Sequence, residues 1–197
     1  MDKQVIISIG RQYGSCGHIV AQRIAEKLHI SLYDKNILQE IAEKINRDYE
    51  KLKKFDEKPR NVWFSRRLGE HSNSLEEAMA NMQFAYLRKK AEAGESFVVV
   101  GRCADSALAG EKGLVSIFIC ANMEDRLHRV IEADKLSERE AKITITRMDK
   151  QRKEYHDAYS EKSWGMAEAY DMCLNISGMT IDDAADFIIS YVDLVIE

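Results

Sequence analysis

The sequence predicts an α/β fold in which helices cover both faces of a parallel sheet. Four or five short apolar segments alternate with stretches that have the period of amphipathic helices, which is the pattern of parallel strands joined by helical crossovers. Three glycines follow the first apolar segment, and a helical pattern begins directly after them. The 197 residues fit a single domain, residues 1–197, with a substantial core.

Composition favours a small anionic ligand over a polymer. Charged residues make up 31% of the chain, hydrophobic residues 45%, and the net charge is −4, which is not typical of a general binder of nucleic acid or of membranes. No apolar stretch has transmembrane length and no signal-peptide region is present, so we expect a cytoplasmic protein. The four cysteines lack C-x-x-C spacing and are expected to be reduced.

The first predicted strand and helix enclose a glycine-rich loop. The β-branched run Val5–Ile9 is typical of a central parallel strand, and residues 18–29 have a helical apolar pattern. Between them lie Gly10, Gly14 and Gly17, which let backbone N–H groups turn toward an anion at a helix N-terminus. The segment predicts a phosphate cradle, and the alternative is an ordinary turn between strand and helix.

This loop departs from the P-loop pattern G-x-x-x-x-G-K-[ST]. Aligned through the helix, the lysine position falls on Gly17 and the hydroxyl position on His18. If Gly17 is the last motif glycine, these positions fall on His18 and Ile19. Neither register supplies an amine and a hydroxyl together. Cys16 is interpreted as a small filler residue, with a reactive thiol at the helix start as the alternative.

The next segments continue the alternation and add an insertion. Residues 46–74 are polar and charge-dense, and we expect either a mobile insertion on the substrate side or a surface excursion. Asp34 lies just before the second helix. The predicted elements are a strand at 30–33, a helix from about Ile37, and a helix at about 75–93 with Met79 and Ala85 on its buried side.

Polar groups follow the next strand, where an open α/β sheet places ligand-binding residues. The run Phe97–Val100 ends in Gly101 and Arg102, and Asp105 lies close behind. The remaining predicted elements are a strand at Leu114–Cys120, a helix capped by Asn122 that carries Arg126 and Arg129, a long helix to about 158 opened by the capping box Ser137/Glu140, a strand at Tyr170–Ile176, and a closing helix capped by Thr180.

One face of the long helix combines acid, base and hydroxyl groups. At 100° per residue, the residues that share this face are Asp149, Arg152, Tyr155 or His156, and Tyr159. The alternative is a solvated helix with local ion pairs. Four further arginines are expected at the same edge of the sheet, at loop or helix-start positions: Arg11, Arg102, Arg126 and Arg129.

Converging arginines beside a glycine-rich loop favour phosphoryl transfer. The planar guanidinium binds phosphate through two hydrogen bonds, and several such groups can neutralise charge on a transferred phosphoryl group. The sequence has no nucleophile elbow with a Ser-His-Asp order, and its five histidines lack zinc-ligand spacing. A kinase is therefore favoured over a hydrolase or a zinc enzyme.

Six segments, taken in order, carry a resemblance to a known family: ISIGRQYGSCGHIVAQRIAEKL, LYDKNIL, VVVGRCAD, IFICANMEDRLHRV, MDKQRKEYHDAYSEKSWG and YDMCLNIS. Together they resemble the cytidylate kinase-like proteins, relatives of bacterial cytidylate kinase among the P-loop nucleoside monophosphate kinases. The resemblance implies a three-layer α/β/α fold with a five-stranded parallel sheet, a helical insertion for the monophosphate and a lid at about 135–165.

The resemblance also implies roles for single residues. Arg102 matches the arginine of a G-R-D element, but Cys103 stands at the aspartate position and Asp105 is a candidate replacement. The implied ATP-binding residues are Gly10, Arg11, Gln12, Tyr13, Gly14, Ser15, Cys16, Gly17 and His18; the implied acceptor-binding residues are Asp34, Arg102, Asp105, Asp149 and Arg152; the catalytic candidates are Arg11, Arg102, Arg126 and Arg152.

Together these observations predict a phosphotransferase that uses ATP and Mg²⁺, with no metal ligand assigned, and that acts on CMP or a related small acceptor. The loop lysine would be replaced by Arg11 or by a lid arginine. We expect a monomer or homodimer without nucleic acid or membrane partners. The alternatives are a non-catalytic nucleotide-binding or regulatory protein, and a kinase for a non-nucleotide small molecule.

Overall fold

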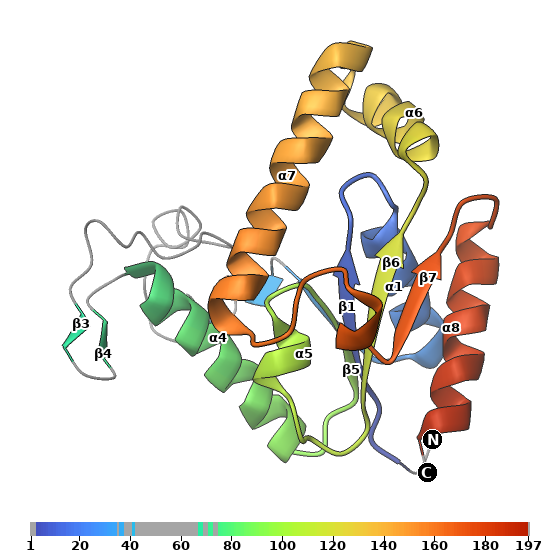
Figure 1. The fold of residues 1–197 in the computed structure, drawn as a ribbon. Helices are drawn as coiled ribbons and strands as arrows, with labels where there is room; N and C mark the ends of the chain where they lie inside the picture. Colours follow the sequence, from blue (N-terminus) through green and yellow to red (C-terminus); the bar gives the residue numbers. More distant parts are fainter. Residues whose placement is uncertain are drawn as a thin grey trace.

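Five parallel strands form the central sheet of the computed structural model, in the order β2-β5-β1-β6-β7 (Figure 1). Their bounds are β1 Ile6–Arg11, β2 Ser31–Tyr33, β5 Phe97–Val100, β6 Leu114–Cys120 and β7 Met172–Asn175. The predicted α/β class and the five-stranded parallel sheet are confirmed.

The structure describes residues 3–34, 36–37, 41, 67–68, 71–72 and 75–196. Most of the predicted substrate-side insertion at 46–74 therefore lies outside the described residues. Within that segment, β3 (Arg67–Leu68) and β4 (His71–Ser72) pair as a short antiparallel hairpin.

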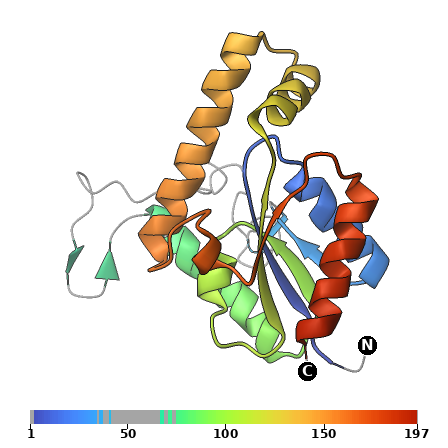
Figure 2. The same ribbon diagram turned by 45° about the vertical axis from the view of Figure 1, so that its right-hand side comes forward.

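Alternating side chains of the strands bury both faces of the sheet. In β5, Val98 and Val100 pack in one apolar cluster, whereas Phe97 and Val99 pack in another. The first cluster is completed by α1 (Gly17–Leu28) and α8 (Ile181–Val195), the second by α4 (Leu75–Glu92) and α5 (Ala104–Ala107). The two views show these helix pairs on opposite sides of the sheet (Figure 2).

Helices α6 (Met123–Asp134) and α7 (Glu138–Tyr159) rise above the carboxyl ends of the strands (Figure 1). The predicted capping box opens α7, because Ser137 Oγ accepts from Glu140 N while Glu140 Oε2 accepts from Ser137 N at 2.9 Å. The short helix η1 (Ala167–Ala169) leads from α7 back to β7. The ligand-binding edge of the sheet thus lies beneath these two helices.

One local expectation is wrong, and a second is confirmed for the position of a residue but not for its hydrogen bond. Ala85 is exposed, because α4 turns Ala80, Phe84 and Leu87 inward, although Met79 is buried as expected. Asn122 stands at the N-cap of α6 but makes no capping side-chain hydrogen bond, because its side-chain oxygen accepts from Asn175 instead.

Two expectations about the whole chain can be compared with the structure. Among the described residues, no helix combines the length and the apolar character that a membrane crossing needs. Cys16, Cys103, Cys120 and Cys173 are all free thiols, as expected.

Candidate functional site

The loop between β1 and α1 is fixed internally by the Ser15 hydroxyl. Ser15 is fully buried, and its Oγ donates to the Gln12 carbonyl at 2.9 Å and accepts from Gly17 N at 3.3 Å. Gln12 N in turn donates to the Ile119 carbonyl of β6 at 3.0 Å. The loop is therefore tied to the sheet and braced by its own hydrogen bonds.

The N-terminus of α1 presents unbonded backbone donors. The N–H groups of Gly14, Cys16 and His18 make no hydrogen bond to any described residue. Cys16, at the N-cap, has φ 64° and no capping side-chain bond, and the first helical turn contains no acidic residue. Several N–H groups converging at the positive end of a helix form an anion site. This geometry favours the predicted phosphate cradle over an ordinary turn.

Side chains from α6 and α7 hold the outer side of the loop at Tyr13. Asp149 Oδ1 accepts from Tyr13 N at 2.7 Å, and Arg126 Nε donates to the Tyr13 carbonyl at 2.7 Å. Arg126 also forms a short ion pair with Asp149, and its side chain is only 4% exposed. The Tyr13 hydroxyl donates to Asp134 at 2.9 Å. Both backbone groups of Tyr13 are thus bonded to side chains of α6 and α7.

Arg129 of α6 and Arg152 of α7 also approach carbonyls of this part of the chain. Arg152 Nη1 donates to the Arg11 carbonyl at 3.1 Å, and Arg129 Nη1 lies 3.4 Å from the Gly14 carbonyl. Tyr155 and His156, on the same side of α7, are buried. The predicted face of α7 therefore packs toward the sheet edge, and the alternative of a fully solvated helix is wrong.

A cavity of about 370 Å³ lies over the loop. Its volume falls within the range of small-molecule sites, roughly 300–1,000 Å³. It is lined by Arg11, Gln12, Tyr13, Gly14, Cys16, Gly17, His18, Ile19, Asp34, Arg129, Val130, Ala133, Asp134 and Arg152. Most of the predicted ATP-binding residues therefore lie on one wall, with Ser15 buried beneath them.

The carboxyl end of β5 makes an unusual turn. Gly101, Arg102 and Cys103 follow one another with φ of 73°, 62° and 50°, all in the left-handed region. For the two non-glycine residues this conformation is strained, and such strain is concentrated at functional sites. The turn buries Arg102, which is 2% exposed and whose Nη2 donates to the Asp34 carbonyl at 3.3 Å.

A buried pair follows this turn. His156 Nε2 lies 2.9 Å from Asp105 Oδ2, and both side chains are 6% exposed. Asp105 thus bonds to the lid helix, which the sequence analysis did not foresee. Among the described residues, Cys103, Asp105 and His156 also form a group whose ligand atoms lie within 4.8 Å of one another. Burial raises the pKa of the Cys103 thiol to about 12, so this thiol is protonated at neutral pH in this structure.

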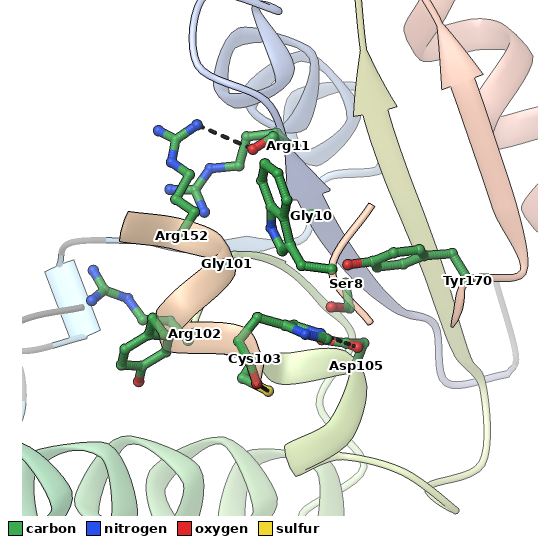
Figure 3. A pocket seen from close by; sticks show the side chains of 12 residues that line it. Ser8, Gly10, Arg11, Gly101, Arg102, Cys103, Asp105, Arg152 and Tyr170 are labelled. Carbon is green, nitrogen blue, oxygen red and sulfur yellow. Dashed lines mark hydrogen bonds and ion pairs between the residues drawn. The ribbon is translucent and has the colours of Figure 1, made fainter. Parts of the chain in front are cut away.

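A small cavity of about 20 Å³ lies between the ends of β1 and β5 (Figure 3). Its lining includes Arg11, Arg102 and Arg152, so three of the four predicted catalytic arginines meet there. Two lining residues, Trp164 and Tyr170, were not predicted as site residues. Burial, followed by the nearby Asp105 charge, raises the pKa of Tyr170, which keeps its hydroxyl protonated.

The predicted site residues thus divide into two groups. Arg126 and Asp149 are absent from the linings of both cavities and instead hold the backbone of Tyr13 from both sides, an arrangement that we call the clamp.

Asp34 lines the large cavity, with its carboxylate 3.5 Å from His18 Nε2. Magnesium in kinase sites is held by one or two carboxylates together with substrate phosphates. Asp34 is suited to that role.

Comparison with known proteins agrees with this architecture. A model of the cytidylate kinase-like family matches residues 6–178. An uncharacterized protein from Eubacterium ventriosum has a solved structure with 36% sequence identity and a TM-score of 0.77, and the match covers 96% of this chain and 99% of that one. A search of the curated proteins finds no match.

More distant solved structures support the fold alone. Shikimate kinase from Bacteroides thetaiotaomicron has 11% identity and a TM-score of 0.57, over 96% of this chain and 98% of that chain. A sugar kinase from Janibacter sp. has 8% identity and a TM-score of 0.56, over 98% and 96%. The fold of this chain is therefore similar to the folds of these two small-molecule kinases.

Proposed function

Because the chain belongs to the cytidylate kinase-like family, we propose that it transfers the γ-phosphoryl group of ATP to CMP or a related small acceptor. The observation that supports this most directly is the set of unbonded N–H groups at Gly14, Cys16 and His18 on the wall of the large cavity. Donors arranged in this way suit the phosphates of a nucleotide.

The residues divide the work between the two cavities. The loop N–H groups bind the donor phosphates, and Arg11 and Arg152, which line both cavities, lie where the transferred group would pass. An acceptor oxygen forms its bond to the γ-phosphorus as the bond to the ADP oxygen breaks, so no covalent enzyme intermediate is needed. Bound Mg²⁺, held by the phosphates and Asp34, would neutralise phosphate charge.

A second candidate function is nucleotide binding without catalysis. The observation that favours it is the missing loop lysine: its position falls on Gly17 in the register aligned through the helix, and on His18 in the other register. Such a protein would bind ATP in the same cavity and transfer nothing.

The two functions are separated by measuring ADP formation. Purified protein is incubated with ATP, Mg²⁺ and, in turn, each nucleoside monophosphate and a panel of small hydroxylated acceptors. We expect ADP formation to depend on CMP and to be low with AMP. A thermal shift with ATP, but no acceptor-dependent ADP, would establish the non-catalytic function instead. Turnover with AMP but not CMP would contradict the pyrimidine assignment.

A further inference from the structure

We propose that Arg11 supplies the charge of the lysine that the phosphate loop lacks, and that its side chain takes the space of that lysine. The inference rests on the proposed function, since it concerns the group that contacts the donor phosphates. It identifies one residue where the sequence left Arg11 and the lid arginines as alternatives.

The first observation is the close contact between Arg11 and Gly17. A Cβ atom added at Gly17 would lie 2.7 Å from Arg11 Cβ and 3.3 Å from Arg11 Cγ. Gly17 is not among the residues with positive φ, so its backbone would allow a side chain. The stem of Arg11 therefore explains why position 17 is glycine: the space in which a lysine side chain would begin is filled by the arginine.

The second observation is where this arginine lies. Arg11 is the last residue of β1 and lines both the large cavity over the loop and the small cavity beside β5. Figure 3 shows its side chain extending from the end of β1 beside that of Arg152. It is also the one arginine or lysine within residues 10–18. A cation at this position can contact a phosphoryl group as it moves from ATP to the acceptor.

The third observation concerns the other arginines. Arg126 is buried against Asp149 and donates to the Tyr13 carbonyl, so it braces the loop. Arg129 and Arg152 donate to backbone carbonyl oxygens. They therefore bind the acceptor groups of the backbone, whereas a phosphate would be bound by its N–H donors. These three residues come from the lid helices, whereas Arg11 belongs to the loop itself and contacts the lysine position directly.

The test is an exchange of the two side chains. Arg11→Gly removes the cation and clears the Cβ contact, and Arg11→Gly/Gly17→Lys then restores a P-loop lysine in the cleared space. We expect Arg11→Gly to lower kcat by about 10²-fold or more, as loss of one preorganised charge donor does. The kcat of the double variant should be at least about tenfold higher than that of Arg11→Gly. Gly17→Lys alone should be impaired, because its side chain meets Arg11.

The control is Arg23→Gly, which removes an arginine from the outer face of α1, where it pairs with Glu26 and Asp182. It should keep wild-type turnover, and thermal melts verify that every variant is folded at the assay temperature. Either of two results would overturn the proposal. One is turnover of Arg11→Gly within about twofold of wild type, which is a small difference in activation free energy. The other is a double variant that is no faster than Arg11→Gly.

Failure of the proposed function gives a different result. If wild type forms no ADP with any acceptor, the Arg11 assignment is decided by binding of ATP and of adenosine. Weaker binding of ATP to Arg11→Gly, with adenosine binding unchanged, supports contact between Arg11 and the phosphates. Equal weakening of both ligands, or no weakening of either, overturns it.

Discussion

A glycine followed by an arginine stands at the carboxyl end of both neighbouring strands, as the last two residues of β1 and directly after β5, yet the two ends are built in different ways. Gly10 and Arg11 are the last residues of β1 and are followed by a five-residue loop and the helix α1, whereas Gly101 and Arg102 are themselves part of a strained left-handed turn. The first end leaves backbone N–H groups unbonded, and the second buries its arginine completely.

The difference lies in what stabilises each end. The loop after β1 is clamped from outside by Asp149 and Arg126, which belong to the lid helices. The turn after β5 is fixed by its own backbone and by the Asp105–His156 pair. Both ends are therefore bonded to α7, the loop through Asp149 and the turn through His156, and the loop is held in addition by Arg126 of α6. The predictions below test this contrast.

The largest effect is expected at the clamp. Asp149→Ala leaves the Arg126 guanidinium buried without its carboxylate and leaves Tyr13 N without an acceptor, so the free energy of unfolding should fall by about 3 kcal/mol. Urea denaturation measures the loss. Lys150→Ala, which removes an exposed ion pair with Glu154, is the matched control and should cost under about 0.5 kcal/mol. A loss at Asp149 as small as the control would refute the clamp.

The buried pair after β5 should give a smaller loss. Asp105→Ala leaves His156 Nε2 buried and without its acceptor, at a cost of about 2 kcal/mol. Asp105→Asn keeps an acceptor oxygen and should retain more of the stability in the same urea titration. If the two variants unfold at the same urea concentration, the hydrogen bond to His156 does not stabilise the turn.

A third prediction separates backbone conformation from crowding in the loop. Gly14 and Gly94 both have φ 76°, so alanine at either position incurs the left-handed penalty of about 1–2 kcal/mol. A Cβ at Gly94 meets nothing within 4 Å, whereas one at Gly14 would lie 3.0 Å from Arg126 O and from Val130 Cγ2. Gly14→Ala should therefore cost about 1 kcal/mol more than Gly94→Ala. Equal melting temperatures would show that α6 does not press on the loop.

The sequence predicted what depends on local pattern. The strand Leu114–Cys120 matches β6 residue for residue, and the capping box opens α7 as expected, because alternation and capping are carried by neighbouring residues. The shared face of α7 was likewise readable from its helical period.

Contacts between residues that are far apart in the sequence could not be predicted, because no local pattern of the sequence encodes them. Asp105 and His156 are separated by 51 positions, and Arg126, expected to contact phosphate, is instead buried against Asp149. The sequence shows that the loop lysine is missing, but the close approach of Arg11 to Gly17, on which the Arg11 proposal rests, becomes visible only in the folded chain.

The smallest effect is expected from the thiol in the turn after β5. Burial raises the pKa of Cys103 to about 12, whereas the unfolded thiol ionises near its ordinary pKa of 9.0. Above that value the unfolded chain loses the proton while the folded chain keeps it, so stability is complete at lower pH and falls as pH rises from about 9 toward 12. Between pH 8 and pH 9 this difference lowers the free energy of unfolding by roughly 0.35 kcal/mol. Cys103→Ala removes this dependence, so the difference in unfolding free energy between wild type and variant should shrink by that amount. If the free energies of unfolding of wild type and Cys103→Ala change in parallel with pH, solvent reaches the sulfur. The turn after β5 would then be as accessible to solvent as the loop after β1.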